Sequence, residues 1–232
     1  VITAFNNEWN KLKNNPDYES EYPNVSGRSD TAATVQAGMD FSQAAKTYQL
    51  WLVCLINMII LSCLMSILVH IVPHARDMGF SAHKAAGVLS CIGGVSMLGR
   101  FATGLVIDRI GSRSSMMISL VVLVTGLLWL QAADTLWKLY LFASIYGLAH
   151  GGFFTVLSPI IAELFGTRAH GSLFGLLVFS GTAGGAIGPF MVGYLFDTSG
   201  SYALPFSLMV AAGLSGIGLL SLMRPISTGN NG

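Results

Sequence analysis

The chain has 232 residues, of which 53% are hydrophobic and 10% are charged, and its mean hydropathy is +0.63. Because about 25% of the residues of a typical soluble domain are charged, this composition indicates a membrane protein. The net charge of +1 provides no basic field that would attract nucleic acid. Cys54, Cys63 and Cys91 all lie in apolar segments, and they predict neither a disulfide framework nor a metal site.

The chain begins with a polar segment, residues 1–46, which we expect to be a cytosolic linker. Within it, the stretch NNPDYESEYPNVSGRSD has no helical or strand period. The first residue is Val1 and no signal peptide precedes the polar start, so we expect the sequence to be a piece of a longer chain.

Six long apolar segments follow within residues 47–225, which we expect to form a transmembrane domain, and residues 226–232 a short cytosolic tail. A membrane-spanning helix needs about 20 apolar residues, whereas a barrel strand would alternate over about ten. The chain is therefore predicted to be an all-α membrane protein. The predicted spans are Leu50–Val72, Ala85–Ile107, Ser114–Ala133, Leu139–Ala162, Gly171–Phe196 and Ala203–Met223.

The distribution of Lys and Arg between the connections predicts which side of the membrane is cytosolic. An even number of spans places both termini on one side, and that side collects five basic residues against three. We therefore expect both termini to be cytosolic, in a plasma (inner) membrane. The first set is Lys46, Arg109, Arg113, Arg168 and Arg224, and the opposite set is Arg76, Lys84 and Lys138.

Two stretches 89 residues apart resemble each other, GRFATGLVIDRIGS at Gly99–Ser112 and GPFMVGYLFDTSGS at Gly188–Ser201. The offset spans three helices, so the two copies run in opposite directions, as in the inverted repeats of secondary transporters. Convergent helix-end composition is the alternative, but ungapped agreement favours a 3+3 repeat. The identical pairs are Gly99/Gly188, Phe101/Phe190, Gly104/Gly193, Asp108/Asp197, Gly111/Gly200 and Ser112/Ser201.

The stretch GLVIDRIGSR at Gly104–Arg113 resembles the loop motif G-x-x-x-D-R-x-G-x-R of the major facilitator superfamily, in the copy between the eighth and ninth helices. This resemblance implies that the six spans are the C-terminal half of a twelve-helix transporter, with residues 1–46 as its central loop and an N-terminal six-helix half missing. The stretch Ala162–Pro189 is similar to the oxalate/formate antiporter and monocarboxylate transporter branch. The resemblance implies that Arg100 binds a carboxylate.

Two positions depart from that branch. Ser180 stands where oxalate exchangers have a lysine in the eleventh helix, and Ser96 stands where animal monocarboxylate transporters have an aspartate one turn before the arginine. No Asp or Glu lies inside any predicted span, so we expect a proton carrier elsewhere. The predicted substrate-binding residues are Arg100, His150, Ser96, Thr103 and Ser180.

Arg100 supports the same interpretation on physical grounds. An intramembrane charge costs about 2.5–3.5 kcal/mol on insertion scales, so it normally faces a cavity and has a function. On a helix, Arg100 shares a face with Gly93, Ser96 and Thr103, and its planar guanidinium suits a bidentate contact with a carboxylate. The alternative is an arginine that snorkels to the membrane surface, because Asp108 is only about 12 Å further along the helix.

The loop motif is predicted to act as a gating latch. Its carboxylate and guanidinium groups can pair with neighbouring helix ends, and such pairs must break when helix bundles rock. The alternative is plain anchoring by positive charge on the cytosolic side. The predicted gating residues are Gly104, Asp108, Arg109, Gly111, Arg113, Glu163 and Arg168.

His150 lies in mid-span and shares a helical face with Tyr146 and Phe154. It is either a packing residue or a group that hydrogen-bonds a substrate or carries a proton. Asn57 and His70, in the first span, are interpreted as local hydrogen-bonding groups rather than ligands.

The sequence therefore predicts a secondary transporter of a small organic anion, a mono- or dicarboxylate, that works by alternating access in the lipid bilayer. A non-transporting membrane sensor or assembly subunit, and an inactive truncated half-transporter, are the alternatives. No nucleophile triad, phosphate loop or metal cluster is recognisable, so we expect neither an enzyme nor a cofactor, and no nucleic-acid partner.

Overall fold

The computed structural model describes residues 38–223, and this part of the chain is built from α-helices. Most of the predicted linker, residues 1–46, and the whole predicted tail, residues 226–232, lie outside the described residues. A short helix, α4 (Phe41–Ala44), is followed by six long helices, each apolar enough to cross a membrane. These are α5 (Tyr48–Asp77), α6 (Ala82–Ile110), α7 (Ser112–Gln131), α8 (Leu136–Phe165), α9 (His170–Ser199) and α10 (Ala203–Leu222). The six predicted spans and the all-α fold class are confirmed.

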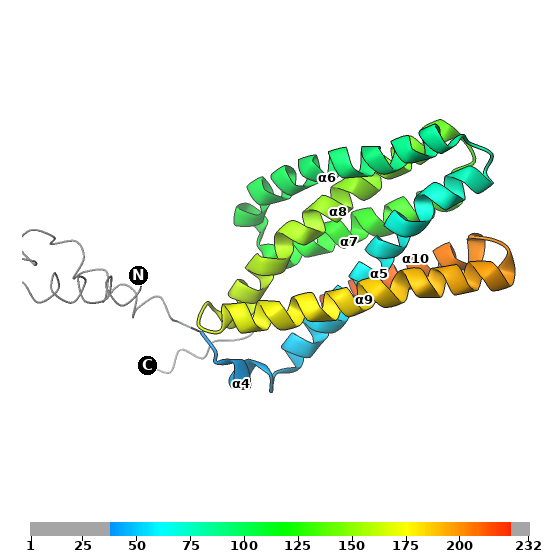
Figure 1. Ribbon diagram of the computed structural model, residues 1–232. Helices are drawn as coiled ribbons and strands as arrows, with labels where there is room; N and C mark the ends of the chain where they lie inside the picture. The colour runs from blue at the N-terminus through cyan, green and yellow to red at the C-terminus, as the bar shows by residue number, and fades with distance from the viewer. Residues whose placement is uncertain (1–37, 224–232) are drawn as a thin grey trace, which may run out of the picture.

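The helix lengths repeat after three helices. Helices α5, α6 and α7 have 30, 29 and 20 residues, and α8, α9 and α10 have 30, 30 and 20. Figure 1 shows α5 and α8 running in opposite directions through the bundle. The predicted 3+3 inverted repeat is therefore confirmed.

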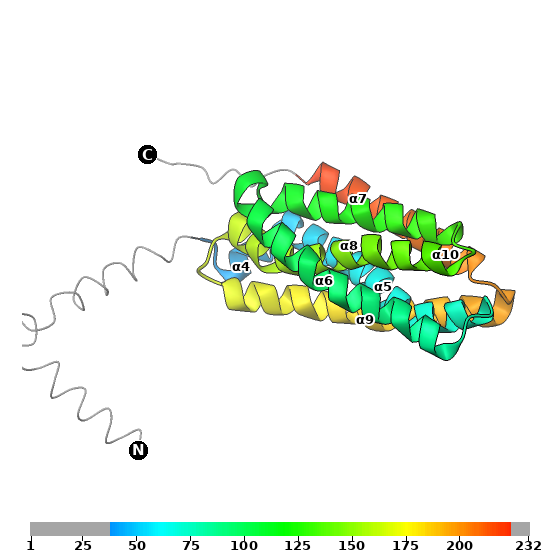
Figure 2. The same ribbon diagram turned by 90° about the horizontal axis from the view of Figure 1, so that it is seen from above.

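The two halves of the repeat are interleaved in space. Helix α5 packs against α9 and α10, and its counterpart α8 packs against α6 and α7. Each of these two groups thus contains helices from both halves. The contact between α7 of one group and α10 of the other joins the two groups. Figure 2 shows the six long helices lying side by side, with α4 at one end of the bundle.

Glycines permit the closest helix contacts. A Cβ atom on Gly99 of α6 would collide with the backbone of Leu148 in α8, and one on Gly188 of α9 would collide with the backbone of Ser62 in α5. Gly99 and Gly188 are equivalent positions of the sequence repeat, so the same device brings both helix pairs together. Away from these contacts, buried Tyr146 donates its hydroxyl to the carbonyl of Leu64 at 2.6 Å and joins α8 to α5.

Another equivalent pair of glycines ends α6 and α9. Gly111 follows α6 with φ +81°, and Gly200 follows α9 with φ +67°. A side chain at either position would be strained, because L-residues rarely adopt positive φ. Equivalent glycines of the two repeat halves therefore serve the same purpose both where helices pack together and where they end.

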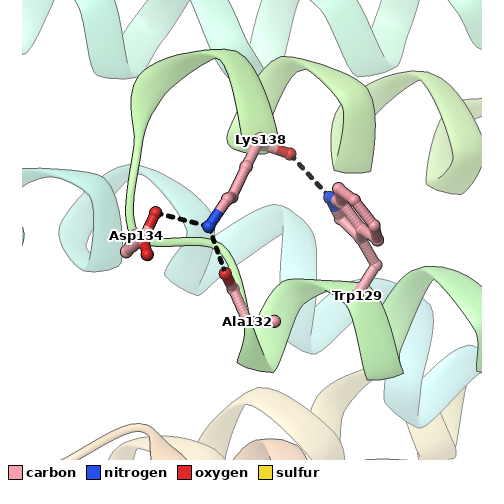
Figure 3. A network of polar contacts seen from close by, with 4 residues as sticks. All are labelled: Trp129, Ala132, Asp134 and Lys138. Carbon is pink, nitrogen blue, oxygen red and sulfur yellow. Dashed lines mark hydrogen bonds and ion pairs between the residues drawn. The ribbon is translucent and has the colours of Figure 1, made fainter.

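The connection between α7 and α8 is closed by polar contacts of Lys138 (Figure 3). Its ammonium donates to the Asp134 carboxylate at 2.7 Å and to the Ala132 carbonyl at 3.3 Å, while its own carbonyl accepts from the Trp129 indole at 3.1 Å. The hydrogen bond from Lys138 holds the pKa of the Asp134 carboxyl below its usual range.

Candidate functional site

Arg100 lies on the exposed surface of α6, about 15 Å along the helix axis from the end of α6 at Ile110. Its neighbours on that surface include Met97 and Phe101, which are 65% and 75% exposed. None of the described acidic residues forms an ion pair with Arg100. The guanidinium carbon instead lies 5.9 Å from the centroid of the Phe154 ring on α8, a cation–π distance.

His150 completes this group, which we call the Arg100 cluster (Arg100, His150 and Phe154). The centroid of its ring lies 5.0 Å from that of Phe154 and 6.1 Å from that of Tyr146. Both ring nitrogens are buried, and neither has a hydrogen-bond partner among the described residues. The helical face predicted for His150 is confirmed, and the structure brings His150 and Arg100 to the same aromatic ring.

Ser96 and Thr103, also predicted to bind substrate, lie in helix contacts on either side of Arg100. Ser96 is buried, donates its hydroxyl to the Gly93 carbonyl at 2.8 Å, and presents its own carbonyl to Gly151 of α8. Thr103 lies against Gly152 of α8, where a Cβ atom would be 2.7 Å from its hydroxyl oxygen. These hydroxyls therefore flank the Arg100 cluster at the α6–α8 contact without joining it.

Ser180, the remaining predicted binding residue, belongs to the contact between α5 and α9. It donates its hydroxyl to the Leu177 carbonyl at 2.7 Å and accepts from Asn57 Nδ2 at 3.4 Å. Asn57 also donates to the Leu177 carbonyl, and His70 Nε2 lies 3.0 Å from the Pro189 carbonyl oxygen. Asn57 and His70 thus form hydrogen bonds, as predicted, and these partners lie on α9 rather than within the first span.

A cavity of about 460 Å³ lies between α5, α8 and α9. Phe154 lines this cavity, and the same ring contacts Arg100. The cavity therefore adjoins the Arg100 cluster and reaches the α5–α9 contact, where it is lined by Asn57 and Thr182. Its size and mainly apolar walls are typical of small-molecule sites.

Among the charged residues of the loop motif, Arg113 forms hydrogen bonds to another helix, whereas Asp108 and Arg109 form none with the described residues. Arg113 Nη2 donates to the carbonyls of Leu220 and Ser221 at 3.2 and 2.9 Å, and so holds the end of α10, where a cation is favourable. Asp108 and Arg109 are exposed and form no hydrogen bond or ion pair with any described residue. Nothing described lies within 4 Å of a Cβ atom placed on Gly104, so no described helix packs closely against this gating residue.

Glu163 and Arg168, the two predicted gating residues outside the loop motif, form no ion pair with Asp108 or Arg109 among the described residues. Glu163 Oε2 accepts a hydrogen bond from the backbone N–H of Ser112 at 2.9 Å and so contacts the loop through its backbone, next to Gly111. Arg168 Nε forms an ion pair with Asp40 Oδ1 at 2.9 Å, both side chains being half exposed. The gating role of these residues stays a prediction.

Comparison with known proteins places these features in a family. Residues 31–231 match the family model described as Major Facilitator Superfamily. The chain is 29% identical over 160 residues to monocarboxylate transporter 12 of Mus musculus, covering 67% of this chain and 33% of that protein. It is 31% identical over 154 residues to monocarboxylate transporter 13 of Rattus norvegicus, covering 66% and 36%.

A bacterial relative shows the same partial coverage. The uncharacterized MFS-type transporter YcxA of Bacillus subtilis (strain 168) is 29% identical over 157 residues, covering 64% of this chain and 38% of that protein. The chain thus spans about a third of the length of the curated relatives it matches. With its six interleaved spans and a family match over most of its length, the chain belongs to the Major Facilitator Superfamily of membrane transporters.

Proposed function

We propose that the protein is a secondary active transporter that moves a small organic anion, a mono- or dicarboxylate, by alternating access. The observation that carries the proposal is the guanidinium of Arg100, which has no acidic partner among the described residues and lies on an apolar helix surface. A charge in that position is costly unless it faces water or an anion. A carboxylate satisfies the planar fork of an arginine in a bidentate contact.

His150 gives the same site a second polar group. Its two unpartnered ring nitrogens provide one donor and one acceptor when the imidazole is neutral. Because Arg100 and His150 both contact the Phe154 ring, His150 is the second polar side chain beside the carboxylate that Arg100 is proposed to hold. The names of the relatives, monocarboxylate transporters 12 and 13, support a monocarboxylate for this chain.

Alternating access requires a second bundle, and the exposed surfaces of α6 and α9 are the place we propose for it. These two repeat-equivalent helices are the least buried of the six described spans. The equivalent residues Phe101 and Phe190 are 75% and 73% exposed. Because Arg100 shares the α6 surface, contact with lipid there is unfavourable. We propose that an N-terminal six-helix half covers this surface and rocks against it.

The orientation of the bundle follows the positive-inside rule in this proposal. The loop with Arg109 and Arg113, the α8–α9 connection with Arg168, and α4 lie at one end of the bundle (Figure 1). We assign this end, with both termini, to the cytosol of a cell whose plasma membrane holds the protein.

Transport in reconstituted vesicles tests the proposal. We expect the complete protein to take up labelled pyruvate or oxalate saturably. Unlabelled substrate preloaded inside the vesicles should accelerate uptake, because loaded carrier then returns to face the external substrate. The neutral amide of the same compound is the control and should not compete. Absence of saturable uptake for both anions would contradict the proposal and favour a non-transporting sensor or an inactive half.

A further inference from the structure

A second cavity, of about 520 Å³, lies at the end of the bundle opposite α4, the end that we assign to the outside of the cell (Figure 1). Its walls come from the last residues of α5, the α7–α8 connection, the α9–α10 connection and the start of α10. It shares no lining residue with the cavity beside Phe154. We call it the outer cavity, and it is separate from the Arg100 cluster.

The two side chains of the outer cavity that are fully charged at neutral pH are both acidic. Asp77, the last residue of α5, and Asp134, in the α7–α8 connection, are exposed there. Asp134 is already paired with Lys138 at 2.7 Å (Figure 3). Asp77 forms no ion pair with any described residue. The outer cavity therefore has one carboxylate left for a cation.

The basic residues that neighbour Asp77 in the chain do not pair with it. His74 also lines the outer cavity, but its ring packs edge-on against Tyr202 and Phe206, with centroids 5.0 and 5.1 Å apart. Arg76 precedes Asp77 directly but does not line the outer cavity, and it forms no ion pair with any described residue. The charge of Asp77 is thus available to a cation from solution.

Helix ends add to the negative potential of the outer cavity. Helices α5, α7 and α9 end beside it, at Asp77, Gln131 and Ser199, and among the described helices α10 alone begins there. A helix C-terminus carries about half a negative charge, so a carboxylate at such an end is unfavourable. A cation bound at Asp77 relieves this repulsion.

The remaining walls favour an organic cation over a metal ion. Met78 and Phe196 line the outer cavity and are partly exposed, and a cation is attracted to the face of an aromatic ring. Among residues 38–223, no group of three or more His, Cys, Asp or Glu is arranged to hold a metal ion. The volume is typical of small-molecule sites.

We propose that the outer cavity binds a small organic cation, an ammonium group on an apolar or aromatic body, with Asp77 as its anionic contact. The proposed carboxylate substrate is repelled by the same charges, so the ligand is a different molecule. Helices α7 and α10, which form part of the walls, lie outside the α6 and α9 surfaces that we assign to the N-terminal half. The cavity is therefore accessible in the complete protein, and the proposal stands independently of the substrate.

Equilibrium binding of labelled phenylethylammonium to the complete protein in detergent, near neutral pH, tests the proposal. We expect saturable binding. Neutral phenylethanol, which has nearly the same shape, should compete about tenfold more weakly or worse, because it forms no charge-assisted hydrogen bond with Asp77. Arg100→Lys should bind the ammonium as the parent does, which separates the outer cavity from the proposed substrate site.

Asp77→Asn should lower the affinity for phenylethylammonium about tenfold or more. Its unfolding temperature should not fall, because the substitution removes an unfavourable charge from a helix end. Asp197→Asn is the matched control, since Asp197 is an exposed aspartate near the same end of the bundle that does not line the outer cavity, and its affinity should equal that of the parent.

Three results would overturn the proposal. The first is equal binding of phenylethylammonium and phenylethanol, or no saturable binding of either. The second is an affinity of Asp77→Asn that equals that of the parent. The third is an equal loss in Asp77→Asn and Asp197→Asn, because the ammonium would then be attracted to the acidic end of the bundle in general and not held in the outer cavity.

Discussion

Glu163, near the end of α8, accepts the backbone N–H of Ser112 at the start of α7 with a distance of 2.9 Å. The contact joins the two repeat halves at the end of the bundle that we assign to the cytosol. A carboxylate beside a helix N-terminus is favourable, because it satisfies an otherwise free N–H and opposes the helix dipole.

Glu163→Ala should therefore destabilise the protein by about 0.5–2 kcal/mol, the usual loss for a helix-capping acceptor. Thermal unfolding in detergent measures the change. Glu163→Gln keeps a neutral acceptor and should lose less than Glu163→Ala. Identical unfolding temperatures for the parent and Glu163→Ala would show that the contact contributes nothing.

Asp108 is predicted to affect the rate of transport and not the affinity for substrate. It is exposed, has no partner among the described residues, and lies about 12 Å from Arg100 along α6. If its partner belongs to the opposite bundle, Asp108→Asn should slow transport about fivefold or more by shifting the balance between states. Uptake rates and equilibrium binding, measured on the same preparation, separate the two effects. Parallel loss of binding would contradict the latch.

Gly151 provides a sharp test of the α6–α8 contact. A Cβ atom there would collide with the Ser96 carbonyl oxygen, which the surrounding helix cannot move cheaply. Gly151→Ala should lower stability by about 1–3 kcal/mol, as overpacking does. Gly218→Ala on the exposed surface of α10, where nothing described lies within 4 Å of an added Cβ atom, is the control and should be neutral or stabilising. Equal stability of the two variants would mean that the helices are not in this contact.

The orientation of the bundle predicts a labelling pattern. Ser42 in α4 and Ser201 after α9 are both exposed and lie at opposite ends of the bundle. In a cysteine-free background, an impermeant thiol reagent added to intact cells should label Ser201→Cys and leave Ser42→Cys unlabelled. The reverse pattern would place the termini outside the cell, and labelling of both would contradict six spans.

The spans and their repeat could be predicted from sequence because each rests on a local signal. An apolar run of about 20 residues indicates a span, and glycines such as Gly111 and Gly200 recur where helices end. The helices extend a few residues beyond the predicted spans, since polar residues such as Glu163 continue a helix past the apolar run. Both kinds of signal lie within single segments of the chain.

The arrangement of the site could be predicted only in part, because it depends on which helix faces which. The spacing of Ser96 and Thr103 places them near Arg100 on a helix, but the crossing of α6 and α8 turns both into the contact. The contact of Arg100 with Phe154, and the hydrogen bond of Asn57 to the Leu177 carbonyl, arise between helices far apart in sequence. The sequence does single out Asn57, because it is the one side-chain amide inside the first predicted span, Leu50–Val72.

The central claim is that Arg100 binds the carboxylate. Arg100→Lys keeps the charge but loses the bidentate fork, so affinity for a small carboxylate should fall about ten- to a hundredfold, or roughly 1.5–3 kcal/mol. Arg100→Gln should bind still more weakly while inserting normally, because removing an intramembrane charge lowers the cost of insertion. Arg76→Lys, an exposed arginine at the other end of the bundle, is the control and should bind as the parent does.

The decisive measurement is equilibrium binding of labelled pyruvate to the complete protein in vesicles, normalised for protein, for the parent, Arg100→Lys and Arg76→Lys. The account predicts that weakened binding is confined to Arg100→Lys. Binding by Arg100→Lys that is indistinguishable from the parent would contradict the account, because Arg100 would then be a snorkelling anchor that any cation can replace.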